Sequence, residues 1–192
     1  MIPLTPAFLV AAATSFVGLR EQGGNNRGLM IELFLREVAQ PAGQPWCAAF
    51  VHHVGYWSHF DHKSNKSVWP LPATASCYVL GHYARTQGIL KDEPQAGDVF
   101  LLWSWIHGRF AHTGVVARVR EDGTNPAGRR WFDCDTVEGN TNAAGEREGE
   151  GVLRRTRRFY PNPGSGDRFI RWADLDLRDA AGKANIPEPR AA

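Results

Sequence analysis

The pattern of apolar residues changes once along this chain, at the segment DEPQAGD (residues 92–98), and this change constrains the fold most. Before it, apolar residues recur at the spacing of an α-helix. After it, short β-branched or aromatic segments alternate with turn residues. Helices that come first and strands that follow predict an α+β protein, in which N-terminal helices pack on one antiparallel sheet of about five strands.

The helices and strands have recognisable starts and ends. Thr5 with Pro6 predicts one helix start, and Asn26 predicts the N-cap of a second helix. A third helix is expected to begin near Trp46, with Phe50, Val54 and Trp57 facing the core. The expected helices are residues 6–17, 26–38, from about 46, and 75–87, and the expected strands are 99–103, 113–119, 130–138, 151–159 and 168–172. We expect one domain over residues 1–179 and a frayed tail over 180–192.

Composition and charge exclude several classes of protein. The net charge of +2 does not indicate a nucleic-acid partner, and no apolar run reaches the roughly 18 residues of a membrane span. The segment AFLVAAATSFVGL (residues 7–19) has the apolar character of a signal peptide. No Lys or Arg precedes it, however, and Pro3 and Pro6 interrupt its start, so we do not expect a cleaved signal.

Cys47 stands in GQPWCAAFV (residues 43–51), at the expected start of an apolar helix. Three cysteines without a CxxC motif favour neither a disulfide framework nor a structural zinc site. A helix N-terminus lowers the pKa of a thiol, because its free N–H groups favour negative charge. Cys47 is therefore a candidate nucleophile, although most lone cysteines are small buried core residues, and this stretch alone favours that interpretation.

A cysteine nucleophile needs a base, and the base needs an acceptor that orients it. We prefer His112, which precedes a strand, to His107, which lies in a loop with glycine. His52, His53, His59 and His62 have no tight ligand spacing and are expected to form a polar face rather than a metal site. In TVEGNTN (residues 136–142), Val137 is expected to face the core, so that Glu138 and, if the strand persists, Asn140 point the other way.

The separated motifs GQPWCAAFV, PQAGDVFLLW with AHTGVVARV, and TVEGNTN with REGEGVLRRTR occur in this order, and NNRG with IELFL precedes them. Together they resemble a CHAP domain, the cysteine, histidine-dependent amidohydrolase/peptidase family, which is related to NlpC-type and papain-like cysteine hydrolases. The resemblance covers about residues 15–160. It implies a papain-like fold, with Cys47 as nucleophile, His112 as base, Glu138 as orienting acid and Asn140 as the polar residue after it.

The resemblance also implies a substrate, bacterial peptidoglycan, in which the enzyme cleaves an amide or peptide bond as an amidase or endopeptidase. A phage endolysin and a wall-remodelling enzyme both fit this description, acting at the cell wall or in the periplasm. We expect a monomer with no cofactor. We also expect no calcium site, because the stretch before Cys47 carries only one acidic residue, Glu37.

Other site residues are weaker predictions. The Gln44 side chain, with the Cys47 backbone N–H, is a candidate for holding the oxyanion. Trp46, Trp103 and Trp105 are candidate groove walls, and core packing explains them equally well. The arginines of REGEGVLRRTRR (residues 147–158) either attract substrate carboxylates or form a solvated strand face offset by Glu146, Glu148 and Glu150.

Other functions than peptidoglycan hydrolysis fit the same residues. The enzyme alternatives are a delivered antibacterial toxin, a polyamine-peptide amidase and an acyl transferase. The non-enzyme alternative is a catalytically silent wall-binding module. The simultaneous presence of Cys47, His112, Glu138 and Asn140 argues against a silent site.

Overall fold

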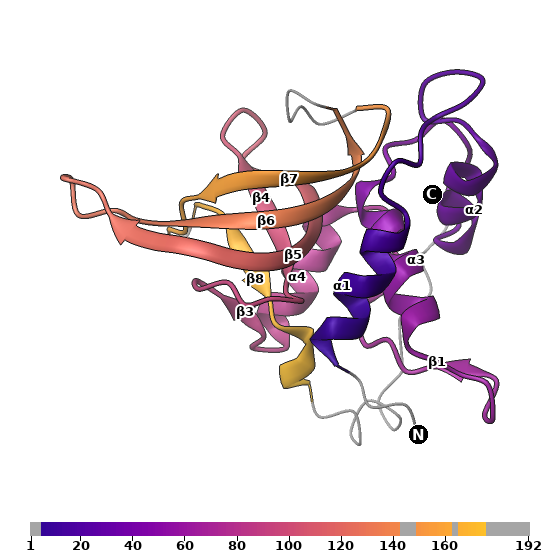
Figure 1. Ribbon diagram of the computed structural model, residues 1–192, viewed down its shortest axis with the longest axis horizontal. Helices are drawn as coiled ribbons and strands as arrows, with labels where there is room; N and C mark the ends of the chain where they lie inside the picture. Colours follow the sequence, from indigo (N-terminus) through magenta and orange to yellow (C-terminus); the bar gives the residue numbers. More distant parts are fainter. Residues whose placement is uncertain (1–4, 143–148, 163–164, 176–192) are drawn as a thin grey trace.

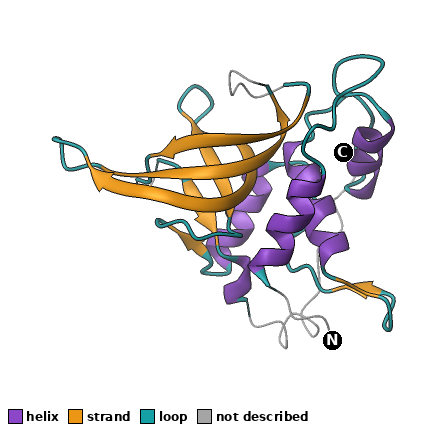
Figure 2. Ribbon diagram, in the orientation of Figure 1, coloured by secondary structure: helices purple, strands orange, loops and turns teal. Residues whose placement is uncertain are grey.

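The computed structural model describes residues 5–142, 149–162 and 165–175. Within them the protein has an α+β fold, with helices against one face of a large antiparallel sheet (Figures 1 and 2). The α+β class predicted from the sequence is confirmed. The expected tail at 180–192 and the domain end at 179 lie outside the described residues. The helices are α1 (Pro6–Ser15), α2 (Leu29–Glu37), α3 (Cys47–Ser58) and α4 (Cys77–Thr86), with a 3-10 turn at Trp172–Asp174.

The predicted start of α2 is wrong. Asn26 does not cap this helix; Gly28 occupies the N-cap position and the helix begins at Leu29. Asn26 instead has a positive φ of 56°, a conformation that asparagine tolerates better than most residues. It is buried, and its backbone N–H donates to a Glu21 carboxylate oxygen at 2.7 Å. Asn26 therefore shapes the turn before α2 rather than the helix itself.

Helix α3 is the central helix of the fold. It contacts α1, α2 and the strands β5 (Arg109–Thr124) and β6 (Arg130–Thr141), and the nine consecutive residues Cys47–Gly55 are all buried. Two expectations for this region are corrected by that position. His52, His53 and His59 are buried and do not form a polar face, whereas Trp57 lies past the buried stretch and is 51% exposed.

The sheet has six strands in the order β3-β8-β4-β5-β6-β7, and every neighbouring pair is antiparallel. The sequence predicted five strands because β3 (Leu90–Lys91) is too short to show a pattern. The other members besides β5 and β6 are β4 (Val99–Ser104), β7 (Gly151–Phe159) and β8 (Arg168–Ile170). The two-residue strands β1 (Phe60–Asp61) and β2 (Lys66–Ser67) form a separate hairpin. In Figure 1 the long strands β5, β6 and β7 extend to the left, beyond the helices.

Two apolar clusters stabilise the described part of the chain, one on each face of the sheet. The larger lies between the helices and the sheet and includes Phe50, Val54 and Val137, as the sequence predicted. The smaller contains Phe100, Val116, Phe132, Cys134, Phe159 and Phe169. Side chains of successive strand residues alternate between faces, so Cys134 belongs to this second cluster. No helix in the described residues is long and apolar enough to cross a bilayer.

Candidate active site

The start of α3 is fixed by contacts on both sides of Cys47. Trp46 is the N-cap residue, and its indole N–H donates to Glu21 Oε1 at 2.8 Å. Its ring is fully buried in the main core, so the prediction that Trp46 walls a groove is wrong. Cys47 is the first helical residue, where backbone N–H groups have no intrahelical acceptor.

Asn140 connects the end of β6 to this helix start. Its φ is 57°, and the β6–β7 register is irregular between Glu138 and Thr141. The amide orientation is assigned from its partners: the oxygen accepts from the Trp46 backbone N–H at 3.2 Å, and the nitrogen donates to Asn26 Oδ1 at 3.2 Å. The regular strand conformation does not persist to Asn140, so its amide holds the α3 start instead of sharing the Glu138 face.

Gly139 allows this close approach of β6 to α3. A Cβ at Gly139 would lie 2.7 Å from the Trp46 ring and 2.8 Å from Phe50. Any larger residue would push the strand away from the helix. The glycine therefore sets the separation between the strand that carries Glu138 and the helix that carries Cys47.

His112 and Glu138 lie on neighbouring strands, as the sequence analysis required. β5 pairs with β6, and His112 Nε2 is 3.0 Å from Glu138 Oε2. Both side chains are buried. His112 Nδ1 has no hydrogen-bond partner among the described residues, so it is the ring nitrogen left for the thiol of Cys47. His107, by contrast, is exposed in the turn between β4 and β5.

Glu138 accepts hydrogen bonds from two residues, Arg157 and Thr136, that the sequence did not predict as its partners. Arg157 of β7 donates to both carboxylate oxygens, from Nε at 2.5 Å and from Nη2 at 2.6 Å. Thr136 Oγ1 adds a third donor group at 2.6 Å. The alternation of β7 puts Arg155 and Arg157 on the same strand face, and that spacing was the available signal. Which of the two reaches Glu138 depends on the β6–β7 register.

The thiol and imidazole shift each other's pKa. A hydrogen bond from the Cys77 thiol, followed by the interactions with His112, holds the pKa of Cys47 well below its ordinary value despite burial. Burial alone would lower the pKa of His112, but its interactions with the Cys47 thiolate and the Glu138 carboxylate raise it to about 9. Burial likewise opposes the ionised form of Glu138, yet His112 and Arg157 lower its pKa to about 2.

These shifts favour a buried row of alternating charges at neutral pH. The order is thiolate at Cys47, imidazolium at His112, carboxylate at Glu138 and guanidinium at Arg157. Each charge has an opposite neighbour, which compensates the desolvation of the row. Cys134 differs sharply: burial, with Asp133 and Asp135, raises its pKa to about 12, so its thiol stays protonated.

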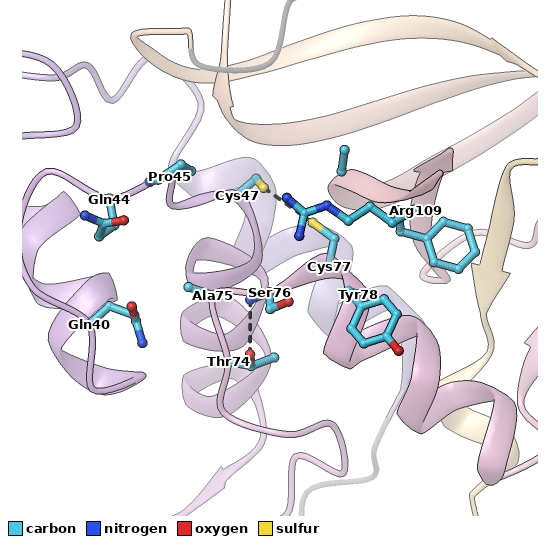
Figure 3. Close-up of a pocket in the computed structure, with 12 residues that line it drawn as sticks. Gln40, Gln44, Pro45, Cys47, Thr74, Ala75, Ser76, Cys77, Tyr78 and Arg109 are labelled. Carbon is cyan, nitrogen blue, oxygen red and sulfur yellow. Dashed lines mark hydrogen bonds between the residues drawn. The ribbon is translucent and has the colours of Figure 1, made fainter. Parts of the chain in front are cut away.

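Cys47 opens onto a cavity of about 260 Å³ between the start of α3, the start of α4 and β5 (Figure 3). Gln44 lies on its wall, in the loop before α3. Neither Trp103 nor Trp105 lines it: Trp103 packs half-buried on Phe110, and Trp105 is 65% exposed. The residues around the cavity are Gln40, Gln44, Pro45, Cys47, Thr74, Ala75, Ser76, Cys77, Tyr78, Arg109, Phe110 and Ala111.

Arg109 is the arginine on this cavity wall. Its side chain reaches from β5 towards Cys47 and Cys77 (Figure 3), and it has no hydrogen-bond or ion-pair partner in the part of the chain described. The described arginines of the 147–158 segment are engaged elsewhere. Their partners are Thr14 for Arg154, the Asn142 carbonyl for Arg155, Glu138 for Arg157 and Asp133 for Arg158. Glu146, Arg147 and Glu148 lie outside the described residues, and Glu150 pairs with Arg20.

No family model, curated protein or solved structure matches this chain. The described residues contain no group of three or more His, Cys, Asp or Glu side chains placed to hold a metal ion.

Proposed function

We propose that this protein is a cysteine hydrolase of amide bonds, with Cys47 as nucleophile, His112 as acid and base, and Glu138 as the orienting carboxylate. The observation that carries the proposal is the continuous buried row from Cys47 through His112 to Glu138, with its thiol end on a cavity wall. The motif resemblance specifies the class further. We infer a papain-like arrangement and a CHAP-type peptidoglycan amidase or endopeptidase.

The first chemical step is attack on the amide carbon. The Cys47 thiolate adds to the carbonyl, and the negative charge moves to the carbonyl oxygen. The Cys47 backbone N–H, free at the first helical position, is one donor for that oxyanion. The Gln44 side chain is the second candidate donor, because it lies on the same cavity wall.

Proton transfer completes the two half-reactions. The His112 imidazolium gives its proton to the leaving amine, and the amine departs. The neutral imidazole then takes a proton from water, which attacks the thioester and releases Cys47. Glu138 holds the ring through Nε2 and stabilises the imidazolium, and Arg157 keeps Glu138 in place and ionised.

The position of Arg109 favours a substrate that carries a carboxylate beside the scissile amide. A guanidinium binds a carboxylate with two parallel hydrogen bonds, and Arg109 is free to do so at the cavity. The stem peptides of peptidoglycan carry such groups. Arg109→Gln is expected to raise KM about tenfold with a smaller change in kcat. Arg118→Gln, an exposed arginine further along β5, is the matched control and should leave both constants unchanged.

The test of the proposed function is digestion of purified peptidoglycan followed by mass spectrometry of the soluble products. The wild type and Cys134→Ala should release fragments that carry a new amine and a new carboxyl group. Cys47→Ala should release none while keeping its circular dichroism spectrum. Product masses distinguish an amidase from an endopeptidase, and the expected site of action is the cell wall or periplasm. Absence of wild-type release, together with turnover of a different amide, would favour the toxin, polyamine-peptide amidase or acyl transferase alternatives.

A further inference from the structure

A second thiol lies against the nucleophile. Cys77 Sγ is 3.7 Å from Cys47 Sγ, and the two residues are the first helical residues of α4 and α3. Both line the cavity, and Figure 3 shows the two sulfur atoms pointing towards each other. The geometry points to Cys77 as a resolving thiol: we propose that a hydroperoxide oxidises Cys47 and that Cys77 then closes a reversible Cys47–Cys77 disulfide.

The positions of the two thiols permit the bond with little movement. A disulfide brings its sulfur atoms to about 2.05 Å, so the two must approach by less than 2 Å. Each is at the start of a separate helix, and both face a cavity into which side chains can rotate. The start of α4 is fixed independently by the Ser76 hydroxyl, which accepts from the Val79 N–H at 3.3 Å.

Reactivity falls on Cys47 first. Thiolates, not thiols, react with peroxides, and Cys47 is the thiolate of the pair. The thiolate attacks one peroxide oxygen: an S–O bond forms, the O–O bond breaks, and the released oxygen takes the proton of the His112 imidazolium and leaves as water or alcohol, so His112 becomes neutral. Cys47 is now a sulfenic acid, two electrons more oxidised, and the peroxide has been reduced.

Cys77 completes the reaction. Its thiol gives its proton to the His112 imidazole, which the first step left neutral, and its sulfur attacks the Cys47 sulfur. The S–S bond forms, the S–O bond breaks, and the leaving hydroxide takes the proton back from His112 and departs as water. One peroxide is therefore reduced for each dithiol oxidised. An external dithiol reverses the bond by exchange. The disulfide occupies the sulfur of Cys47, so its formation should stop hydrolysis, and this effect rests on the proposed function. Formation of the disulfide itself does not rest on the proposed function.

The experiment exposes the full chain to a few equivalents of hydrogen peroxide at neutral pH and analyses it by intact mass and peptide mapping. We expect a loss of about 2 Da, a linked Cys47–Cys77 peptide pair, and full return of the Cys47 thiol to iodoacetamide after dithiothreitol. Cys134→Ala should behave identically, because Cys134 lies in the second cluster. Cys77→Ala should instead gain about 32 Da at Cys47, and dithiothreitol should not reverse this sulfinic product.

Two results would overturn the proposal. One is a wild type that gains oxygen at Cys47 without forming the linked pair, and the other is a Cys77→Ala protein whose oxidised Cys47 is recovered by dithiothreitol as fully as in the wild type. Circular dichroism of Cys77→Ala, with Cys77→Ser as a second variant, ensures that a folded protein is compared. The thiol readout needs no peptidoglycan. A reversible disulfide in a protein that does not hydrolyse peptidoglycan would therefore reject the proposed function alone.

Discussion

Glu138→Gln tests the charge row at its centre, because the substitution keeps the shape of the side chain and removes its charge. The carboxylate is fully buried and accepts from His112, Thr136 and two Arg157 nitrogens, Nε and Nη2. An amide has one oxygen and one NH₂ group. Whichever way it turns, its NH₂ therefore faces donor groups, and Arg157 loses the opposite charge.

The lost contacts and the unpaired charge of Arg157 should lower the free energy of unfolding. Removing one member of a buried ion pair costs about 3–5 kcal/mol. For a domain of this size each kcal/mol lowers Tm by about 2–4 °C, so Glu138→Gln should lower Tm by roughly 6–20 °C. Glu37→Gln is the matched control. Glu37 accepts from His53 Nδ1 at 2.7 Å and from Trp57 at 2.9 Å, but part of its side chain is exposed to solvent. Glu37→Gln should therefore lower Tm by less than Glu138→Gln.

Glu138→Gln should also lower the pKa of His112. A charge-assisted hydrogen bond contributes about 1.5–3 kcal/mol, and each 1.4 kcal/mol is about one pKa unit, so the pKa of His112 should fall by about 1–2 units from about 9. The alkaline limb of the activity profile should move to about pH 7–8, and turnover should fall by roughly 10²- to 10⁴-fold. Glu37→Gln should leave the limb in place.

Stability against pH gives a second measurement. The pKa of Glu138 is lowered from 4.5 to about 2, so its ionisation stabilises the fold above pH 4.5, and this contribution is lost as pH falls towards about 2. The pKa of His112 is raised from 6.5 to about 9, so its contribution is complete below pH 6.5 and is lost as pH rises through about 9. Chemical denaturation should show both losses in the wild type and a smaller acid loss in Glu138→Gln. An alkaline limb and an acid loss identical in the variant and the wild type would refute this reasoning.

Three further predictions concern the same site. The alkylation rate of Cys47 with iodoacetamide should rise at a pH well below the range of a free thiol, and His112→Ala should move this rise to higher pH; a rise at the free-thiol value would leave Cys47 a packing residue. His112→Ala should reduce turnover on peptidoglycan nearly as much as Cys47→Ala, whereas His107→Ala, in an exposed turn, should change it by less than about threefold; the reverse order would reassign the base. Activity should survive excess EDTA, since the proposed chemistry uses no metal; a loss that added calcium restores would contradict this.

Local pattern determined much of what the sequence could predict. The change from helical to strand periodicity predicted the α+β class, because each period follows from the geometry of its own backbone. Pro45 and the apolar run after it placed Cys47 at a helix start, which α3 confirms. The alternation around Val137 predicted that Glu138 points away from the main core, and the pairing of β5 with β6 brings it to His112. The roles of these residues in catalysis stay predictions.

Tertiary structure alone decided which residues meet. Nothing near Cys77 in the sequence indicates that its thiol lies 3.7 Å from Cys47, because the contact joins the starts of two separate helices. The choice of Arg157 as the partner of Glu138 depends on the β6–β7 register, and the left-handed turn at Asn140 depends on the approach of β6 to Trp46. The burial of His52 and His53 follows from the packing of α3 against α1, α2, β5 and β6. Periodicity and turn chemistry are properties of neighbouring residues, whereas register and packing are selected by the whole folded chain, where burial requires each charge to find a partner.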